Sequence, residues 1–250
     1  MTQQIGVPLR TIDFSELHLG IVKDPKHGYG KNMNPCIDCH GAMFAHAVKI
    51  MDAEGFDCIS TGEILGQRPM SQNKQALGTV DRIAVSGGRL IRPLCAKNLP
   101  ETEVEKSGLI DREQLLDLHG RNRKPQIAMA KEWNIVEYPS PAGGCQLTDP
   151  GYSKRLKDYL EHYPQAKREE IAIIKYGRHI WQENSLIMIG RNKEDNELLT
   201  SNVIPGDTKI YTPGIPGPSV VIRFATPESI EHLKETLPTF NKKLQAAIEE

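Results

Sequence analysis

The order of predicted elements between residues 42 and 94 constrains the fold more than any other feature of the sequence. Apolar residues recur with helical spacing over residues 42–53, which predicts a helix with a wide apolar face. Residues 56–60 and 89–94 read as short buried strands. Strands separated by helices are typical of a parallel sheet. Ligands collect beyond the carboxyl ends of such strands, and Thr61, Gly62 and Glu63 lie at one such end.

The pattern changes near residue 165. A helix expected over 152–163 is followed by short strand-like runs separated by turn residues, and by a polar-faced helix over 227–250. We therefore expect an α/β chain of two domains. Residues 1–164 would hold a parallel sheet, and residues 165–250 a small α+β domain. The strands expected in the second domain are 171–176, 185–189, 208–211 and 219–224.

The remaining elements of the first domain are expected from local patterns. Residues 5–14 alternate in polarity and read as a strand, whereas residues 24–34 are rich in turn residues and read as a basic loop. Helices are expected over 111–119 and 123–133. Residues 139–144 are rich in Pro and Gly, which predicts a rigid loop.

Charge and hydropathy narrow the function classes. The 250 residues include 31 basic and 32 acidic side chains, for a net charge of −1, so nucleic-acid binding would have to come from local patches. The sequence has neither an apolar run of the roughly 18–20 residues that span a bilayer nor an N-terminal signal pattern. We therefore expect a cytoplasmic protein without a membrane partner.

The spacing of the cysteines is more informative than their number, five. A disulfide framework is not expected in a long chain of this type. Cys36 and Cys39 form a C-x-x-C pair, and Cys145 follows the Pro- and Gly-rich run. Three thiolates can hold a metal or cluster and leave one position open, as a catalytic site requires. Cys58 and Cys95 lie in apolar runs, which predicts core packing.

Three other interpretations of these cysteines stay open. Residues 36–40 read C-I-D-C-H, which matches the pattern for covalent haem attachment, although the chain shows no export signal. A closed zinc site would use Cys36, Cys39, Cys145 and His40. In the third interpretation Cys145 is an ordinary loop residue, and the pair is redox-active or unrelated to it.

Three runs together resemble a known family: residues 26–40 (KHGYGKNMNPCIDCH), 61–72 (TGEILGQRPMSQ) and 139–145 (PSPAGGC). They resemble the ThiI/MnmA-like tRNA thiouridine synthetases of the PP-loop superfamily, over roughly residues 1–160. The resemblance implies a Rossmann-like adenine-nucleotide hydrolase domain. Such enzymes use ATP and Mg²⁺ to adenylate a tRNA uridine oxygen, which sulfur from a donor protein or sulfide then replaces.

The resemblance also implies site residues. Cys36, Cys39 and Cys145 would hold a [4Fe-4S] cluster, with a persulfide on Cys39 or Cys145 as the alternative. Nucleotide contacts would come from residues at and after the end of the 56–60 strand. These are Thr61, Gly62, Glu63, Gln67 and Arg68.

A second resemblance covers roughly residues 166–240. Residues 188–199 (MIGRNKEDNELL) and 213–223 (PGIPGPSVVIR) are similar to the NFACT RNA-binding domain. The similarity implies tRNA as a partner. Phosphate contacts would come from Arg191, Asn192, Lys193 and Arg223, and base stacking from Trp181 or Tyr211. Whether the chain forms homo-oligomers is left open.

One motif of the thiouridine synthetases is not present. Their phosphate-binding loop reads S-G-G-x-D-S, whereas Ser86-Gly87-Gly88 and Gly143-Gly144 lack the Asp-Ser pair. We expect the loop to lie in a longer reading frame or in a partner. The alternative function is therefore a non-catalytic, RNA-binding module that holds a cluster or zinc and needs a separate ATP-binding partner.

Overall fold

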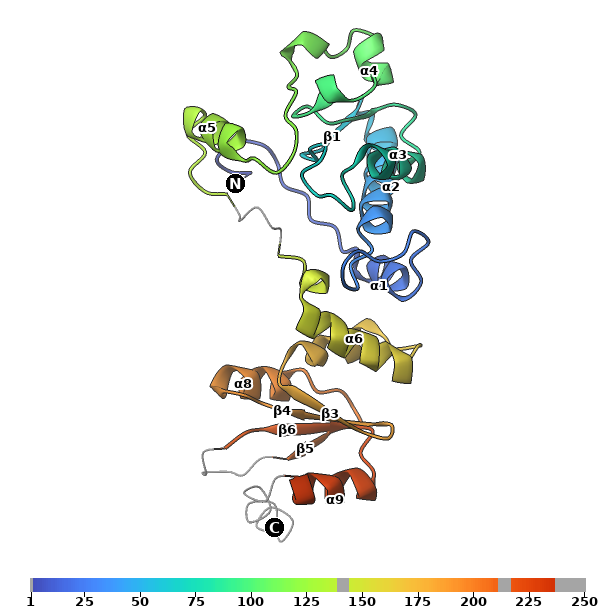
Figure 1. Ribbon diagram of the computed structural model, residues 1–250, viewed down its shortest axis with the longest axis vertical. Coiled ribbons are helices and arrows are strands. Elements are labelled where there is room, and N and C mark those ends of the chain that lie inside the picture. Colours follow the sequence, from blue (N-terminus) through green and yellow to red (C-terminus); the bar gives the residue numbers. More distant parts are fainter. Residues whose placement is uncertain (1, 139–143, 211–216, 237–250) are drawn as a thin grey trace. The chain divides into compact units, whose positions relative to one another are not determined.

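The computed structural model describes residues 2–138, 144–210 and 217–236. The chain divides into two compact units, Met1–Thr148 and Asp149–Glu250. The first contains a small parallel sheet and the second an antiparallel sheet (Figure 1). The architecture is thus mixed α/β, as expected. No helix within the described ranges is both long and apolar enough to cross a bilayer.

The parallel sheet of the first unit is built from two short strands joined by a helix. β1 (Ile59–Ser60) pairs with β2 (Leu90–Ile91), with Ile59 opposite Leu90. The crossover contains α3 (Lys74–Ala84), which packs against α2 (Cys36–Glu54). A Cβ atom on Gly41 of α2 would lie 2.6 Å from Ile83 Cγ2, so the close approach of the two helices requires glycine there. The other elements of this unit are α1 (Ser15–Lys23), η1 (Ala96–Asn98), α4 (Glu103–Lys106), η2 (Arg112–Gln114), α5 (Lys124–Glu132) and η3 (Gln146–Thr148).

Several expectations for the first unit are corrected. Residues 5–14 form no strand. Residues 111–119 form only the single turn η2, because the segment after it pairs with the chain beyond β2. There, the backbone N–H groups of Leu116 and Leu118 donate to the carbonyl oxygens of Pro93 and Leu94. The prediction of a helix over 123–133 is confirmed by α5.

Helix α3 was not among the elements expected from the sequence, although the sequence contains a residue that marks its start. The Asn73 side chain accepts a hydrogen bond from the Ala76 N–H at 2.9 Å, which is a standard N-cap. Leu77 of α3 packs with Ile64, Leu65 and Cys95 in a core cluster. The predicted burial of Cys95 is therefore confirmed, while Cys58 is only partly buried.

The second unit is a four-stranded antiparallel sheet between helices. The strand order is β3-β4-β6-β5, and all three pairings are antiparallel. Figure 1 shows α8 and α9 on opposite sides of this sheet. Ile187, Ile189 and Ile222 pack with Leu233 of α9 in one core cluster. The elements are α6 (Pro150–His162), α7 (Arg168–Ala172), η4 (Ile173–Lys175), β3 (Arg178–Gln182), β4 (Ser185–Ile189), α8 (Lys193–Ser201), β5 (Thr208–Ile210), β6 (Val220–Arg223) and α9 (Pro227–Thr236).

The predicted strands 185–189, 208–211 and 219–224 are confirmed by β4, β5 and β6. The predicted strand 171–176 is wrong: its apolar residues belong to α7 and η4, and the first strand of the sheet is β3. The unit begins at Asp149 rather than at residue 165. Helix α6 belongs to it because Arg155 Nε donates to the Ile174 carbonyl at 2.9 Å. Residues 237–250 of the expected last helix lie outside the described residues.

Candidate three-thiol site

Helix α2 begins at the C-x-x-C pair, earlier than the sequence predicts. Cys36 and Cys39 both lie in its first turn, and residues three apart share one face of a helix. The unpaired N–H groups of a helix N-terminus carry partial positive charge, which favours thiolates. For Cys39, this helix-start effect acts against the burial of its thiol.

Cys145 completes the group from far along the chain. It is exposed and precedes the turn η3. Burial raises the pKa of the Cys39 thiol to about 11, and the nearby thiolates of Cys145 and Cys36 add to this rise. Cys36 and Cys145 thus lie near enough to Cys39 for their charges to act on its thiol, within the first unit. Because their negative charges oppose one another, a bound cation would reverse the rise and favour the thiolates.

The donor set is suited to a soft metal. Three thiols match zinc or an iron–sulfur cluster by ligand chemistry. Within the described ranges, no three or more His, Cys, Asp and Glu side chains are grouped as they would be around a metal ion. The side chains would therefore have to close in upon binding.

His40, the expected fourth zinc ligand, is held by a buried carboxylate. Its Nδ1 lies 2.7 Å from Oε1 of Glu63, whose residue is only 5% exposed. A carboxylate on one ring nitrogen is the usual way a histidine is oriented beside a metal site. The contact leaves Nε2 as the nitrogen for any ligation.

Glu63 belongs to a chain of buried ion pairs. Arg92 donates through Nε to Glu63 Oε2 at 3.0 Å, and through Nη1 and Nη2 to Asp81 at 3.1 and 2.8 Å. Burial alone would raise the pKa of Glu63. The hydrogen bond from His40 and the charge of Arg92 outweigh it and lower that pKa. Glu63 is therefore an ionised part of the framework.

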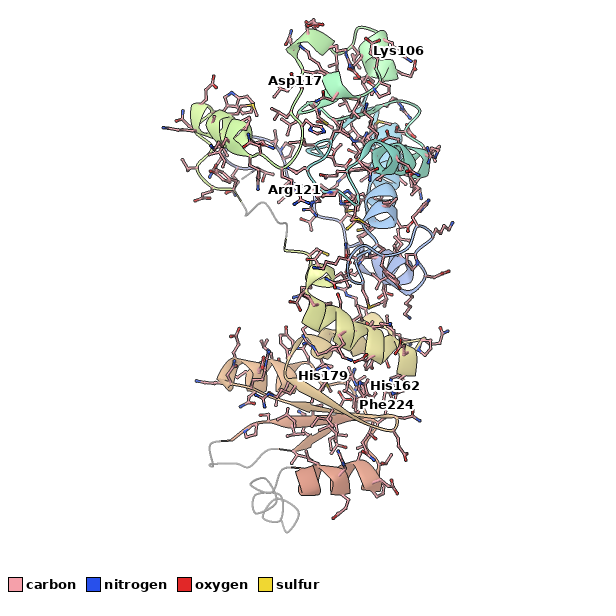
Figure 2. The ribbon with its side chains drawn as sticks, in the orientation of Figure 1. Lys106, Asp117, Arg121, His162, His179 and Phe224 are labelled. Carbon is pink, nitrogen blue, oxygen red and sulfur yellow. The ribbon has the colours of Figure 1, made fainter. Side chains whose placement is uncertain are left out.

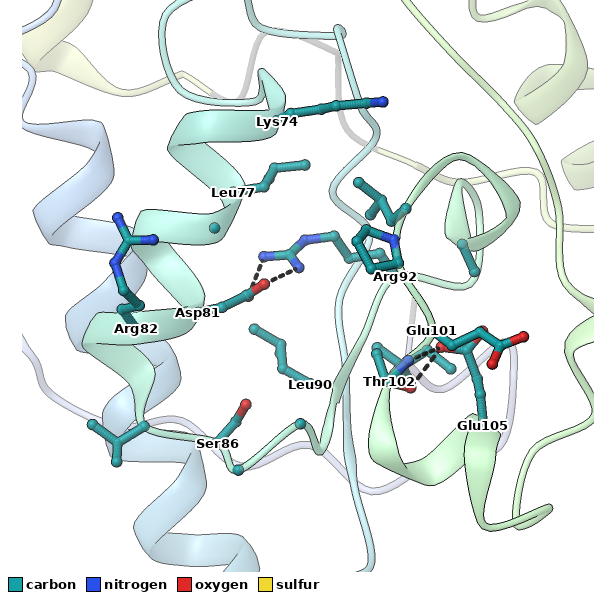
Figure 3. Close-up of a pocket in the computed structure, with 18 residues that line it drawn as sticks. Lys74, Leu77, Asp81, Arg82, Ser86, Leu90, Arg92, Glu101, Thr102 and Glu105 are labelled. Carbon is teal, nitrogen blue, oxygen red and sulfur yellow. Dashed lines mark hydrogen bonds and ion pairs between the residues drawn. The ribbon is translucent and has the colours of Figure 1, made fainter.

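Arg92 also lines a pocket of about 620 Å³ between α3 and the segment that leads into α4. Figure 3 shows its guanidinium reaching toward Asp81, with Thr102 and Glu105 on another wall. All three nitrogens of this guanidinium donate within the chain. The pocket is thus connected to the His40 side of the first unit through Arg92 and Glu63.

The residues expected to bind the nucleotide are placed in different settings. Thr61 and Gly62 follow β1, and Gln67 and Arg68 are half-buried in the turn beyond it. Glu63 is engaged by His40 and Arg92. No glycine-rich phosphate loop is formed at residues 86–88. Gly87 and Gly88 have φ of 61° and 77°, so they form a tight turn.

In the second unit, the structure corrects one expected RNA contact. Arg223 is 1% exposed, and its guanidinium donates to Asp207, to Tyr159 Oη and to the Glu170 carbonyl. Four of its five N–H donors are engaged inside the unit, and its burial leaves no surface on which a phosphate could meet it. Arg223 was expected to contact RNA because it is basic. Its pairing with Asp207, a partner distant in sequence, uses that charge inside the unit instead.

The other expected RNA contacts lie at the start of α8. Arg191 pairs with Asp195, and the Asn192 side chain caps the helix by accepting from the Asp195 N–H at 2.9 Å. Lys193 is highly exposed, with a side chain 91% accessible. It is therefore the cation of this group that is best placed for a solvent-side contact.

Trp181 lies in an aromatic cluster, and Tyr211 lies outside the described residues. The rings of Trp181 and His162 stack at 3.8 Å between centroids and 7° between planes. Tyr163 joins them and contacts Phe224, with ring centroids 4.3 Å apart. His162 and Phe224 of this cluster are labelled in Figure 2. Because Trp181 is only partly exposed, intramolecular stacking already occupies much of its surface.

The chain matches no protein-family model, and no curated protein or solved structure is similar enough to be matched with it. The resemblances described above therefore rest on the quoted residues alone.

Sequence reasoning missed the polar side chains that organise the site. Asn32, Asn34, Asp38 and Arg92 all make hydrogen bonds in or near it. The one available signal was the cluster of Asn and Asp residues around a helix start, which is typical of caps and turns. Asn32 and Arg92 have partners distant in sequence, so those contacts had no local signature.

Proposed function

We propose that the chain acts in ATP-dependent tRNA thiolation, with sulfur reaching a uridine through the three-thiol site. The observation that carries this proposal is that Cys36 and Cys39 share the first turn of α2, while Cys145 lies near enough for its charge to act on Cys39. The parallel β1–α3–β2 unit is compatible with part of a Rossmann-like nucleotide domain. Cytoplasmic location is part of the proposal.

A [4Fe-4S] cluster on Cys36, Cys39 and Cys145 would supply an iron with an open position for sulfide. The chain's own residues set up this site. The start of α2 carries Cys36 and Cys39, and Glu63 holds Nδ1 of His40, the residue that follows Cys39. Zinc is the alternative occupant, and a persulfide on Cys39 or Cys145 is the alternative carrier.

Substrate contacts are proposed on both units. Thr61, Gly62, Gln67 and Arg68 follow the carboxyl end of β1, where nucleotides bind in parallel sheets. Glu63 acts there as a positioning residue, because its carboxylate is committed to His40 and Arg92. On the second unit Arg191, Asn192 and Lys193 would meet tRNA phosphates.

The second candidate is a module that binds RNA and holds a cluster or zinc without catalysing the reaction alone. One observation favours it: S-G-G-x-D-S does not occur in the 250 residues, and residues 86–88 form a tight turn instead. A separate protein would then supply the ATP-binding loop. Whether the chain also forms homo-oligomers is part of the question of which partner it needs.

Two measurements test the proposal. After anaerobic purification, we expect iron and sulfide in the wild type and their loss in Cys36→Ala, Cys39→Ala and Cys145→Ala. Unmodified tRNA, Mg·ATP and sulfide should then yield thiouridine. A colourless protein with stoichiometric zinc would contradict the cluster. Saturable Mg·ATP binding by this chain would exclude the second candidate, whereas thiolation only after adding an ATP-binding protein would support it.

A further inference from the structure

The loop before α2 is fastened to the helix that carries the cysteine pair. Asp38, on the first turn of α2, is 7% exposed. Its carboxylate accepts a hydrogen bond from the His27 backbone N–H at 2.8 Å and lies 2.7 Å from His27 Nδ1. The loop also runs directly into α2 through Pro35. Residues 28–34 are therefore held between two fixed points.

Asn34 connects this loop to one sulfur. Its Nδ2 donates to Cys36 Sγ at 3.2 Å, while its Oδ1 accepts the Asn32 backbone N–H at 3.1 Å. Because the oxygen faces an N–H group, the amide nitrogen must face the sulfur. A Cβ atom on Gly30 would lie 2.3 Å from Asn34 Nδ2, so glycine leaves the space that this side chain uses.

Asn32 connects the same loop to the turn that bears the third sulfur. Its Nδ2 donates to the Thr148 carbonyl at 2.7 Å. Thr148 in turn donates to the Cys145 carbonyl through its N–H at 3.0 Å and through Oγ1 at 2.6 Å. Asn32 is thus the side-chain link between the loop on α2 and the short turn of Cys145.

We propose that Asn32 and Asn34 are positioning residues that keep the parts of the three-thiol site near one another, so that the thiols can close around a metal. Asn34 orients the Cys36 sulfur, and Asn32 holds the Cys145 turn to the loop before the helical pair. The inference rests on the proposed three-thiol site and adds residues that support its ligands. A tethered turn loses less conformational freedom when its thiolate binds, so the third thiolate should depend on Asn32.

The test is a Cd²⁺ titration of the full-length, reduced, metal-free protein. The ultraviolet thiolate-to-cadmium charge-transfer absorbance reports how many sulfurs bind. The wild type should show a three-thiolate intensity, and Cys145→Ala a two-thiolate intensity. Asn32→Ala should fall to the Cys145→Ala intensity, with affinity weakened at least about tenfold, as for other residues that support metal ligands. Asn122→Ala, which alters another exposed asparagine of the first unit, is the matched control.

A second variant distinguishes the loss of this hydrogen bond from a general folding defect. Asn32→Asp keeps the size of the side chain but cannot donate to the Thr148 carbonyl. Its added negative charge would attract Cd²⁺, so a lost third thiolate in this folded variant would support the inference strongly. A three-thiolate intensity in both Asn32 variants would overturn the inference and leave the proposed site intact. A wild type indistinguishable from Cys145→Ala would overturn both.

Discussion

The guanidinium of Arg223 is enclosed by hydrogen-bonding partners inside the second unit. Asp207, whose side chain is also 1% exposed, receives two of its hydrogen bonds. The pKa of Arg223 is raised, because these contacts and that of Tyr159 outweigh the opposing effect of burial. At the residue scale, removing one partner of a buried ion pair costs more stability than removing one partner of an exposed pair, because the other charge is left buried and unpaired.

Replacing Arg223 should therefore destabilise the second unit. We expect Arg223→Leu to lower the free energy of unfolding by about 3–5 kcal/mol, because Asp207 is left buried without its partner. Lys154→Leu removes the Lys154–Asp158 pair on α6, in which the lysine is largely exposed, and should cost much less. Chemical denaturation measures both. Equal losses in the two variants would contradict the argument.

His179 makes the stability of the second unit depend on pH. Burial lowers the pKa of His179 to about 4, and the nearby charge of Arg155 adds to this effect against the hydrogen bond to the Tyr176 carbonyl. Between its unfolded pKa of about 6.5 and this value, the unfolded chain binds the extra proton. The free energy of unfolding should therefore fall by up to about 3 kcal/mol as the pH decreases from about 6.5 to about 4.

Denaturation curves across that pH range provide the measurement. His179→Gln should flatten the profile, because the glutamine does not titrate. His162→Gln, on α6, serves as the control and should keep the slope at pH 4–6.5. An unchanged slope in His179→Gln would rule out this histidine as the source.

A substitution at Gly30 should change Cd²⁺ binding at the proposed site without a large change in the free energy of unfolding. Gly30→Ala should push the Asn34 amide away from Cys36, because only the end of a flexible side chain has to move. We expect weaker Cd²⁺ binding with a free energy of unfolding changed by less than about 1 kcal/mol. Gly20→Ala adds the same methyl group within α1, where nothing lies within 4 Å, and should leave Cd²⁺ binding unchanged.

At the scale of elements, helix starts determine where the important side chains lie. Asn73, Asp149 and Asn192 each cap a helix through a side-chain oxygen. In a sequence, such a cap can be recognised as a single polar residue just before apolar residues with helical spacing. The start of α2 instead has Pro35 at the cap position, with no side-chain cap bond, and this is why the pattern placed the helix too late.

The start of α8 allows a capping role and an RNA role to be separated. Asn192→Ala should cost about 1 kcal/mol of stability through the lost cap. Lys193→Ala should leave stability within about 0.5 kcal/mol but reduce the salt dependence of tRNA binding by about one charge. Denaturation and tRNA titrations at several salt concentrations measure these effects. A salt dependence unchanged by Lys193→Ala would remove that residue from the proposed interface.

At the scale of the whole molecule, each unit has its own hydrophobic core. Two cores in separate units predict two unfolding transitions. Arg223→Leu should shift only the transition of the second unit, whereas Leu77→Ala should shift only that of the first, by about 2–5 kcal/mol. Calorimetry of both variants distinguishes this outcome from a single cooperative transition, which would contradict independent units.

Local signals in the sequence were enough for part of the fold. The short apolar run 185–189 predicted β4, and the order of helices and strands predicted a parallel sheet in the first unit, which β1 and β2 form. They failed at 171–176, where Ile171, Ile173 and Ile174 are buried in a helical segment. A short apolar run has the same composition in a helix as in a strand, so burial alone could not distinguish the two.

By itself, the sequence determined which residues carry thiols and that the pattern of elements changes in the second half of the chain. Both are properties of residue type and spacing along the chain. Only the tertiary structure put Cys145 within range of the charge of Cys39 and paired Arg223 with Asp207. It also placed Asn32 against Thr148. The physical reason is that these contacts join residues distant along the chain, and whether a side chain is buried and paired depends on its neighbours in space.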